Sequence, residues 1–148
     1  QQAAVQLWPL VALSVEEKAI NPDMLDAWWK FQGGPSDPTT RQRGALLLTL
    51  LTATGREISP VQWDGLLAGP LIEPGAVSSP ALRYALSAAA VNGQIGESVL
   101  LALLGLGAGG PQNSGLATLG ETISALRDAG LMRDAQAIAV EAALAGGL

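Results

Sequence analysis

Three glycines in the stretch LLALLGLGAGGPQNSG, residues 100–115, have the spacing G-x-G-x-x-G, at Gly105, Gly107 and Gly110. Such a string binds a dinucleotide when a β-strand precedes it and a helix starts directly after it, because the helix N-terminus then faces the phosphates. Here the preceding residues are typical of a helix, a proline follows the third glycine, and no Gly-Lys-Ser/Thr phosphate loop occurs. We therefore interpret the stretch as a loop in which Gly105 ends a helix and Ser114 caps the next, and we expect no bound nucleotide or other cofactor.

Three pairs of carboxylates could in principle act as acid and base. A hydrolase that uses two carboxylates needs one acid with a raised pKa in an apolar cleft. Neighbouring residues of a helix point in different directions, and an acid in the first turn of a helix is already explained by the helix dipole. These ordinary explanations favour a non-catalytic reading of the pairs, and an enzyme that uses carboxylates alone is kept as a rival hypothesis. The pairs are Glu16 with Glu17, Asp23 with Asp26, and Glu57 with Asp64.

Histidine and cysteine are both absent from the chain. Their absence removes the commonest general base, the commonest transition-metal ligand, cysteine nucleophiles, zinc–thiolate sites and disulfides. A serine nucleophile would need a lysine as its base, but only Lys18 and Lys30 exist and neither follows a serine in an S-x-x-K motif. We expect no catalytic residue and no metal site.

The composition favours one helical domain. The chain has 148 residues, 49% of them hydrophobic and 14% charged, and Leu and Ala, both strong helix formers, dominate over Val and Ile. Its net charge is −5 with no basic run, which argues against nucleic acid or an anionic membrane surface as the partner. No stretch reaches the roughly 18–20 apolar residues that a membrane span needs, so we expect none.

Proline and glycine mark where the elements that hold these side chains begin and end. A small polar residue precedes proline at Asn21-Pro22, Asp37-Pro38, Ser59-Pro60 and Ser79-Pro80. This pattern predicts a helix start, because the first residue caps a free N–H and proline takes the first helical position. Gln62 completes a capping box with Ser59. Glycines such as Gly55, Gly93 and Gly130 close Leu/Ala-rich runs and predict helix ends.

These signals predict an all-α fold of about eight helices stacked as antiparallel helical hairpins, an α-solenoid-like array. We expect residues 1–148 to form a single domain with a candidate hinge in the longer loop at 69–79; residues 106–115 form a second hinge candidate. No period-2 pattern indicates a strand. The expected helices are 3–13, 22–32, 38–54, 60–68, 80–92, 95–105, 116–129 and 132–145.

All six aromatic residues lie in the first 84 positions. Most such rings fill gaps between helices, but Trp28 and Trp29 are adjacent on an expected helix and therefore point about 100° apart. One of them should lie at the edge of the core, where a tryptophan is a typical anchor for a partner. We predict Trp28, Trp29 and Trp63 as the candidate partner-binding residues, and expect Trp29→Ala to weaken binding with little loss of helicity.

The C-terminal segment, residues 118–146, carries one leucine and a series of small residues at Leu126, Ala129, Gly130, Ala135, Ala139 and Ala142. In these residues it resembles tetratricopeptide-like helical repeats, in which small residues let paired helices approach closely. The resemblance implies an α-solenoid that presents a surface to a protein or peptide, and it implies no catalytic residues. The aromatic positions of that family are missing, and the earlier helix starts do not recur at its period of about 34 residues.

Together these features predict a protein-interaction or scaffold module without catalytic function, either an accessory subunit or the terminal domain of a larger exported protein. Its partner would be another protein or peptide, within a larger complex or alone; the oligomeric state stays open. The alternative is a carrier of a small apolar ligand in an inter-helix pocket. The N-terminal QQAAVQ fits either a mature end left by signal-peptide removal or an arbitrary boundary of the sequence. The first reading favours a periplasmic or other exported location.

Overall fold

The computed structural model describes residues 2–70 and 75–148, and within them it contains eight α-helices and no strand. The only pairing of β type there is one isolated bridge between Ala19 and Glu57. The predicted all-helical fold is confirmed, and each predicted helix boundary lies within one residue of the observed one. The helices are α1 (Gln2–Ser14), α2 (Pro22–Phe31), α3 (Pro38–Ala53), α4 (Pro60–Leu67), α5 (Pro80–Val91), α6 (Ile95–Leu106), α7 (Leu116–Asp128) and α8 (Met132–Ala145), with a 3-10 turn, η1 (Pro111–Asn113), before α7.

Three of the four expected N-terminal caps form. The side chain of Asn21 accepts hydrogen bonds from two backbone N–H groups of α2, Asp37 accepts from the N–H of Thr40, and Ser79 accepts from the N–H of Leu82. The capping box predicted at Ser59 is wrong, because the Ser59 side chain makes no cap hydrogen bond. Proline at the first position is the remaining start signal of α4.

Two expectations about the glycine loop, the roles of Gly105 and Ser114, are wrong. Gly105 lies inside α6, which continues to Leu106, and the residue with positive φ that follows the helix is Gly107, at 68°. Ser114 does not cap α7; its hydroxyl donates back to the carbonyl oxygens of Leu106 and Gly110. Helix, not strand, precedes the glycines, so the local structure expected for a loop between helices is confirmed.

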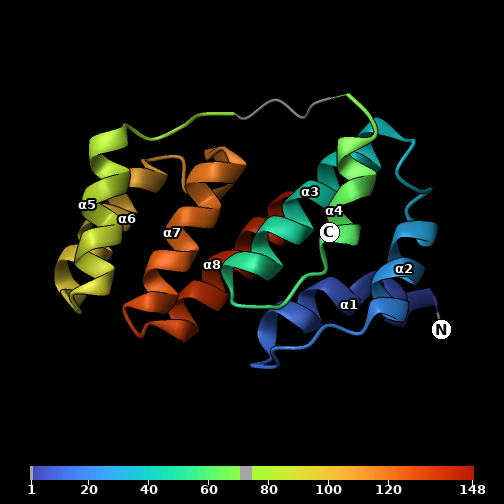
Figure 1. Ribbon diagram of the computed structural model, residues 1–148, viewed down its shortest axis with the longest axis horizontal. Coiled ribbons are helices and arrows are strands. Elements are labelled where there is room, and N and C mark those ends of the chain that lie inside the picture. Colours follow the sequence, from blue (N-terminus) through green and yellow to red (C-terminus); the bar gives the residue numbers. More distant parts are fainter. Residues whose placement is uncertain (1, 71–74) are drawn as a thin grey trace.

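The helices pack as four hairpins, since the two helices of each of the pairs α1–α2, α3–α4, α5–α6 and α7–α8 are in contact. The α7–α8 hairpin lies in the middle: α7 contacts α3, α5 and α6, and α8 contacts α1 and α3. Figure 1 shows α5 and α6 at one end of this array and α1, α2 and α4 towards the other. Helices α4 and α5 follow one another in the sequence but lie on opposite sides of α7, so the order in space differs from the order along the chain.

Helix α3 is buried on most of its circumference. Leu47, Leu48, Leu50 and Leu51 are all fully buried, although four such residues cannot share one narrow helix face. The helix is covered because α1, α4, α7 and α8 all contact it. It therefore serves as the central element on which the N-terminal and C-terminal hairpins are assembled.

Three arginines connect helices by binding the carbonyl groups at helix C-termini. Arg41 donates to the last turn of α4, Arg56 donates to the carbonyl of Ala12 in α1, and Arg127 donates to the carbonyl of Ala53 in α3. The last carbonyls of a helix lack partners within the helix and carry partial negative charge, so a guanidinium there is favourable. Burial lowers the pKa of the Arg56 guanidinium from its ordinary value, while Glu17 and Glu16 act in the opposite direction.

The candidate hinge at 69–79 falls in part on residues 71–74, which lie outside the described residues. The part of this loop after residue 74 is hydrogen-bonded to the start of α7. The carbonyl of Ala76 accepts a hydrogen bond of 3.0 Å from the N–H of Gly115, and the N–H of Ser78 donates to the hydroxyl of Thr118 at 3.0 Å. Across the described residues, no helix has both the length and the apolarity to cross a bilayer.

Candidate functional site

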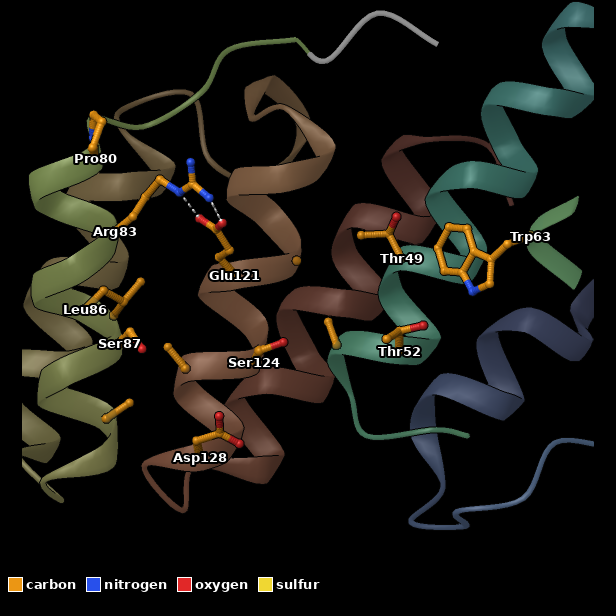
Figure 2. Close-up of a pocket in the computed structure, with 14 residues that line it drawn as sticks. Thr49, Thr52, Trp63, Pro80, Arg83, Leu86, Ser87, Glu121, Ser124 and Asp128 are labelled. Atoms are coloured by element: carbon orange, nitrogen blue, oxygen red, sulfur yellow. Dashed lines mark hydrogen bonds and ion pairs between the residues drawn. The ribbon is translucent and has the colours of Figure 1, made fainter. Parts of the chain in front are cut away.

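A groove of about 610 Å³ runs between α3 and α4 on one side and α5 on the other, with α7 between them. Figure 2 shows Trp63 on one side of it and Arg83, Leu86 and Ser87 on the opposite side. Four segments that are far apart in the sequence therefore contribute to one hollow. Its lining residues are Thr49, Thr52, Ala53, Trp63, Pro80, Arg83, Leu86, Ser87, Ala90, Gly120, Glu121, Ser124, Ala125 and Asp128.

The floor of the groove is built from small residues of α7. Gly120, Ser124 and Asp128 recur at a spacing of four and so lie along one line of the helix. At Gly120 the helices α3 and α7 approach closely: a Cβ added there would lie 3.0 Å from the Thr49 methyl carbon. The groove is open because this line of α7 carries no large side chain.

A salt bridge connects the two helices at one end of the groove. Arg83 of α5 and Glu121 of α7 form a two-point pair, with Nε donating to Oε2 at 2.6 Å and Nη2 donating to Oε1. The hydrogen bond to Glu121 raises the pKa of Arg83. Towards the other end, Asp128 accepts from Nη2 of Arg127 at 2.8 Å. The ends of the groove are therefore polar and charged, while Leu86, the alanines and Trp63 supply its apolar surface (Figure 2).

Trp63 is positioned by α4, and α4 is held by Arg41 of α3. The buried guanidinium of Arg41 donates through Nη1 to the carbonyl of Gly65 at 3.0 Å, and through Nη2 to the carbonyls of Leu66 and Pro70. Gly69 leaves room for this side chain, because a Cβ at that position would lie 2.3 Å from Nη1. The wall that carries Trp63 thus depends on one buried arginine.

The three tryptophans predicted to bind a partner do not lie together. Trp63 lines the groove, whereas Trp28 and Trp29 lie on α2, outside it. Trp28 is fully buried, so its ring is not exposed to a partner, as the anchor role predicted for it would require. Its indole N–H has no hydrogen-bond partner among the described residues. Trp29 is partly buried and packs against α3, where a Cβ on Gly44 would lie 1.8 Å from its ring.

The two adjacent indoles contact each other edge to face, with centroids 5.5 Å apart and planes at 69°. This geometry is favourable for aromatic pairs. The predicted difference between the two rings is observed, since one lies in the core and the other at its edge. Both serve to fix α2 on the rest of the molecule.

Sequence reasoning missed the α5 and α7 sides of the groove. Arg83 and Glu121 are 38 positions apart, and neither lies in a recognisable motif. The sequence held one indication of this pair: the two residues flank a stretch of the chain, 84–120, in which Glu97 is the only charged residue. Two isolated charges that flank so long a stretch with only one charged residue could have been predicted to pair.

The carboxylate pairs considered as catalytic candidates are dispersed over the surface. Glu16 and Glu17 lie in the loop after α1, Asp23 and Asp26 on α2, and all four side chains are exposed. Glu57 and Asp64 are exposed as well. Within residues 2–70 and 75–148, no three Asp, Glu, His or Cys side chains gather where they could hold a metal ion.

Comparison of the chain with protein-family models, with curated protein sequences and with solved structures finds no match.

Proposed function

We propose that this chain is a non-catalytic protein-interaction or scaffold module that binds a segment of another protein in the groove between α3, α4 and α5. The observation that carries the proposal is the partly exposed indole of Trp63 on the wall of a groove of about 610 Å³. Tryptophan is enriched among the residues that dominate binding energy at interfaces, because it buries a large area with few rotamers to immobilise. Trp63 is accordingly the proposed anchor, and the module uses no catalytic residue, metal or cofactor.

The distribution of polarity along the groove fits a peptide segment. An apolar centre formed by Trp63, Leu86 and Ala90 is bounded by the Arg83–Glu121 pair and by Asp128. Protein interfaces commonly combine an apolar core with a polar rim. The straight floor of small residues on α7 suits an amphipathic helix laid along the groove, a common mode of peptide recognition. The resemblance of residues 118–146 to tetratricopeptide-like repeats, which present such surfaces to peptides, supports the same proposal.

The alternative function is transport of a small apolar ligand. The groove volume lies within the range of about 300–1,000 Å³ typical of small-molecule sites, which favours this alternative. The charges of Arg83, Glu121 and Asp128 on the lining favour a peptide over an apolar cargo. Native mass spectrometry of the purified chain separates the two, since a carrier would retain a small molecule of defined mass.

The proposal is tested with peptides selected from a displayed random library on the immobilised chain. A synthetic selected peptide should bind the wild type, and Trp63→Ala should weaken it roughly tenfold or more. Ser124→Arg should have a similar effect, because it fills the floor of the groove at a position that the core does not need. Val61→Ala is the matched control, because Val61 is exposed on the same helix but does not line the groove.

A spectroscopic readout identifies the binding surface independently of affinity. In protein labelled with 5-fluorotryptophan, the ¹⁹F resonance of Trp63 should shift on peptide addition, while that of the fully buried Trp28 should stay in place. The proposal would be contradicted if the affinity of the selected peptides were unchanged in both Trp63→Ala and Ser124→Arg. It would also be contradicted if no peptide could be selected from the library.

A further inference from the structure

The outer half of α6 is apolar and uncovered. Leu100, Leu103 and Leu104 are 59, 61 and 60% exposed, and Ile95 and Val99 are exposed as well. The spacing of residues 99, 100, 103 and 104 puts them next to one another on one side of the helix. The buried residues Ser98, Ala102 and Leu106 occupy the other side. We call the five exposed residues Ile95, Val99, Leu100, Leu103 and Leu104 the α6 face.

Charge is almost absent from the segment of the chain that carries this face. Residues 84–120 contain one charged side chain, Glu97, in a stretch of 37 positions. The surface of a monomeric domain is ordinarily about 25–35% charged, which keeps it soluble. The charged residues that flank the stretch, Arg83 and Glu121, pair with each other. The α6 face therefore lacks the side chains that normally keep a surface in contact with water.

The α6 face also lies at an end of the molecule. Helix α6 packs against α5 and α7, and the α5–α6 hairpin is the outermost unit at one end of the array (Figure 1). In stacked helical proteins the terminal unit normally carries a polar outer face. Here the terminal hairpin is apolar instead, and α5 adds two more exposed apolar residues, Tyr84 and Val91, each 78% exposed.

We propose that a second copy of this chain covers the α6 face, with α6 of one copy packed antiparallel to α6 of the other about a two-fold axis. A surface almost without charge is complementary to itself, whereas a partner of different charge would find nothing on it to pair with. When the two-fold axis passes between Leu100 and Leu103, the two Glu97 residues lie towards opposite ends of the contact. They are then roughly 13 Å apart along the direction of the helices. Salt at physiological concentration largely screens that repulsion.

The area of the face is sufficient for a dimer. Its five side chains expose roughly 500 Å², at the upper end of the largest apolar patch on an ordinary monomer. Two copies would bury about 1,000 Å² in total, which is the lower limit for a specific interface. The expected dimer is consequently reversible and depends on concentration.

Sedimentation velocity over a wide concentration series tests the proposal directly. The wild type should change from monomer to dimer as concentration rises, and Leu100→Glu/Leu103→Glu should raise the dimer dissociation constant about a hundredfold or more with an unchanged helical circular dichroism spectrum. The matched control is Leu144→Glu, since Leu144 is also a leucine exposed by 59% but lies on α8. This control and the groove variant Trp63→Ala should both dimerise like the wild type.

A cross-linking measurement decides the result even if the glutamate variant fails to fold. The chain has no cysteine, so a single introduced thiol reports on one position. Under mild oxidation Leu103→Cys should form a covalent dimer rapidly, and Leu144→Cys should not. A wild type that stays monomeric at every concentration would overturn the proposal and assign the face to another protein or to lipid. A dimer that persists in Leu100→Glu/Leu103→Glu, or that Leu103→Cys does not cross-link, would overturn it equally.

Discussion

The guanidinium of Arg41 donates a hydrogen bond to the carbonyl oxygen of Leu66, and this contact between α3 and the end of α4 positions the wall of the groove. The same side chain also binds the carbonyls of Gly65 and Pro70. A fork of five N–H donors can serve several carbonyls at once, which a lysine ammonium cannot do in this geometry. Arg41 thus links the fold to the proposed site, because α4 carries Trp63.

We expect Arg41→Met to lower the free energy of unfolding by about 2–4 kcal/mol, because it removes the partner of three carbonyls, of which that of Leu66 is in a buried hydrogen bond. Urea unfolding followed by circular dichroism measures the change. Near-ultraviolet circular dichroism should also change, since the environment of Trp63 is altered. Arg133→Met on the exposed surface of α8 is the control and should be nearly neutral. Equal stabilities of the two variants would show that the bonds of Arg41 contribute nothing.

The contact between Trp29 and Gly44 gives a second prediction. Gly44→Ala should destabilise the chain by about 1–3 kcal/mol, because the added Cβ overlaps the indole ring. Trp29→Leu in the same chain should relieve this overlap, so the two substitutions should be non-additive in a double-mutant cycle. Guanidinium unfolding of the four proteins provides the measurement. Strict additivity would mean that Trp29 does not pack on α3, and would return it to the candidates for partner binding.

Two serines in the same sequence context should behave differently. Ser79→Ala should destabilise the chain by about 1 kcal/mol, because the hydroxyl accepts a hydrogen bond from the N–H of Leu82. Ser59→Ala removes no such bond and should change stability by less than about 0.5 kcal/mol. Thermal unfolding of both variants measures the difference. The reverse order of effects would restore the capping box expected from the sequence.

Asp37 gives a prediction for acid pH. The hydrogen bonds from the backbone and the side chain of Thr40 hold the pKa of Asp37 below its ordinary value of 3.8. A carboxylate whose pKa falls on folding stabilises the native state above its unfolded pKa, and that contribution is lost as the pH falls through the folded pKa. Asp37→Asn keeps a capping side chain but cannot titrate.

The stability difference between wild type and Asp37→Asn should therefore be constant at neutral pH and shrink once the pH falls below 3.8. Thermal midpoints of both proteins, measured from neutral to strongly acid pH, follow that difference. A difference that stays the same at every pH would show that ionised Asp37 makes no contribution through its cap.

The positions of the helices were predictable because their signals are local. Pro22, Pro38, Pro60 and Pro80 all stand at the first position of a helix, and glycines such as Gly93 and Gly130 adopt the positive φ that follows a helix end. Backbone sterics at these residues act over a few positions and need no tertiary partner. The errors at Ser59 and Ser114 concern side-chain orientation, which neighbouring segments also influence.

The sequence by itself thus determined an all-helical chain, where its helices begin and end, and that one of two adjacent tryptophans would lie at the edge of the core. Only the tertiary structure decided which one it was, that Trp63 faces Arg83 and Glu121 across a groove, and that α6 is left uncovered. The physical reason is that periodicity shows which side of a helix is apolar but not which helix, if any, covers it. In this chain α7 packs on α3 and α8 packs on α1, and contacts between such distant segments leave no local pattern in the sequence.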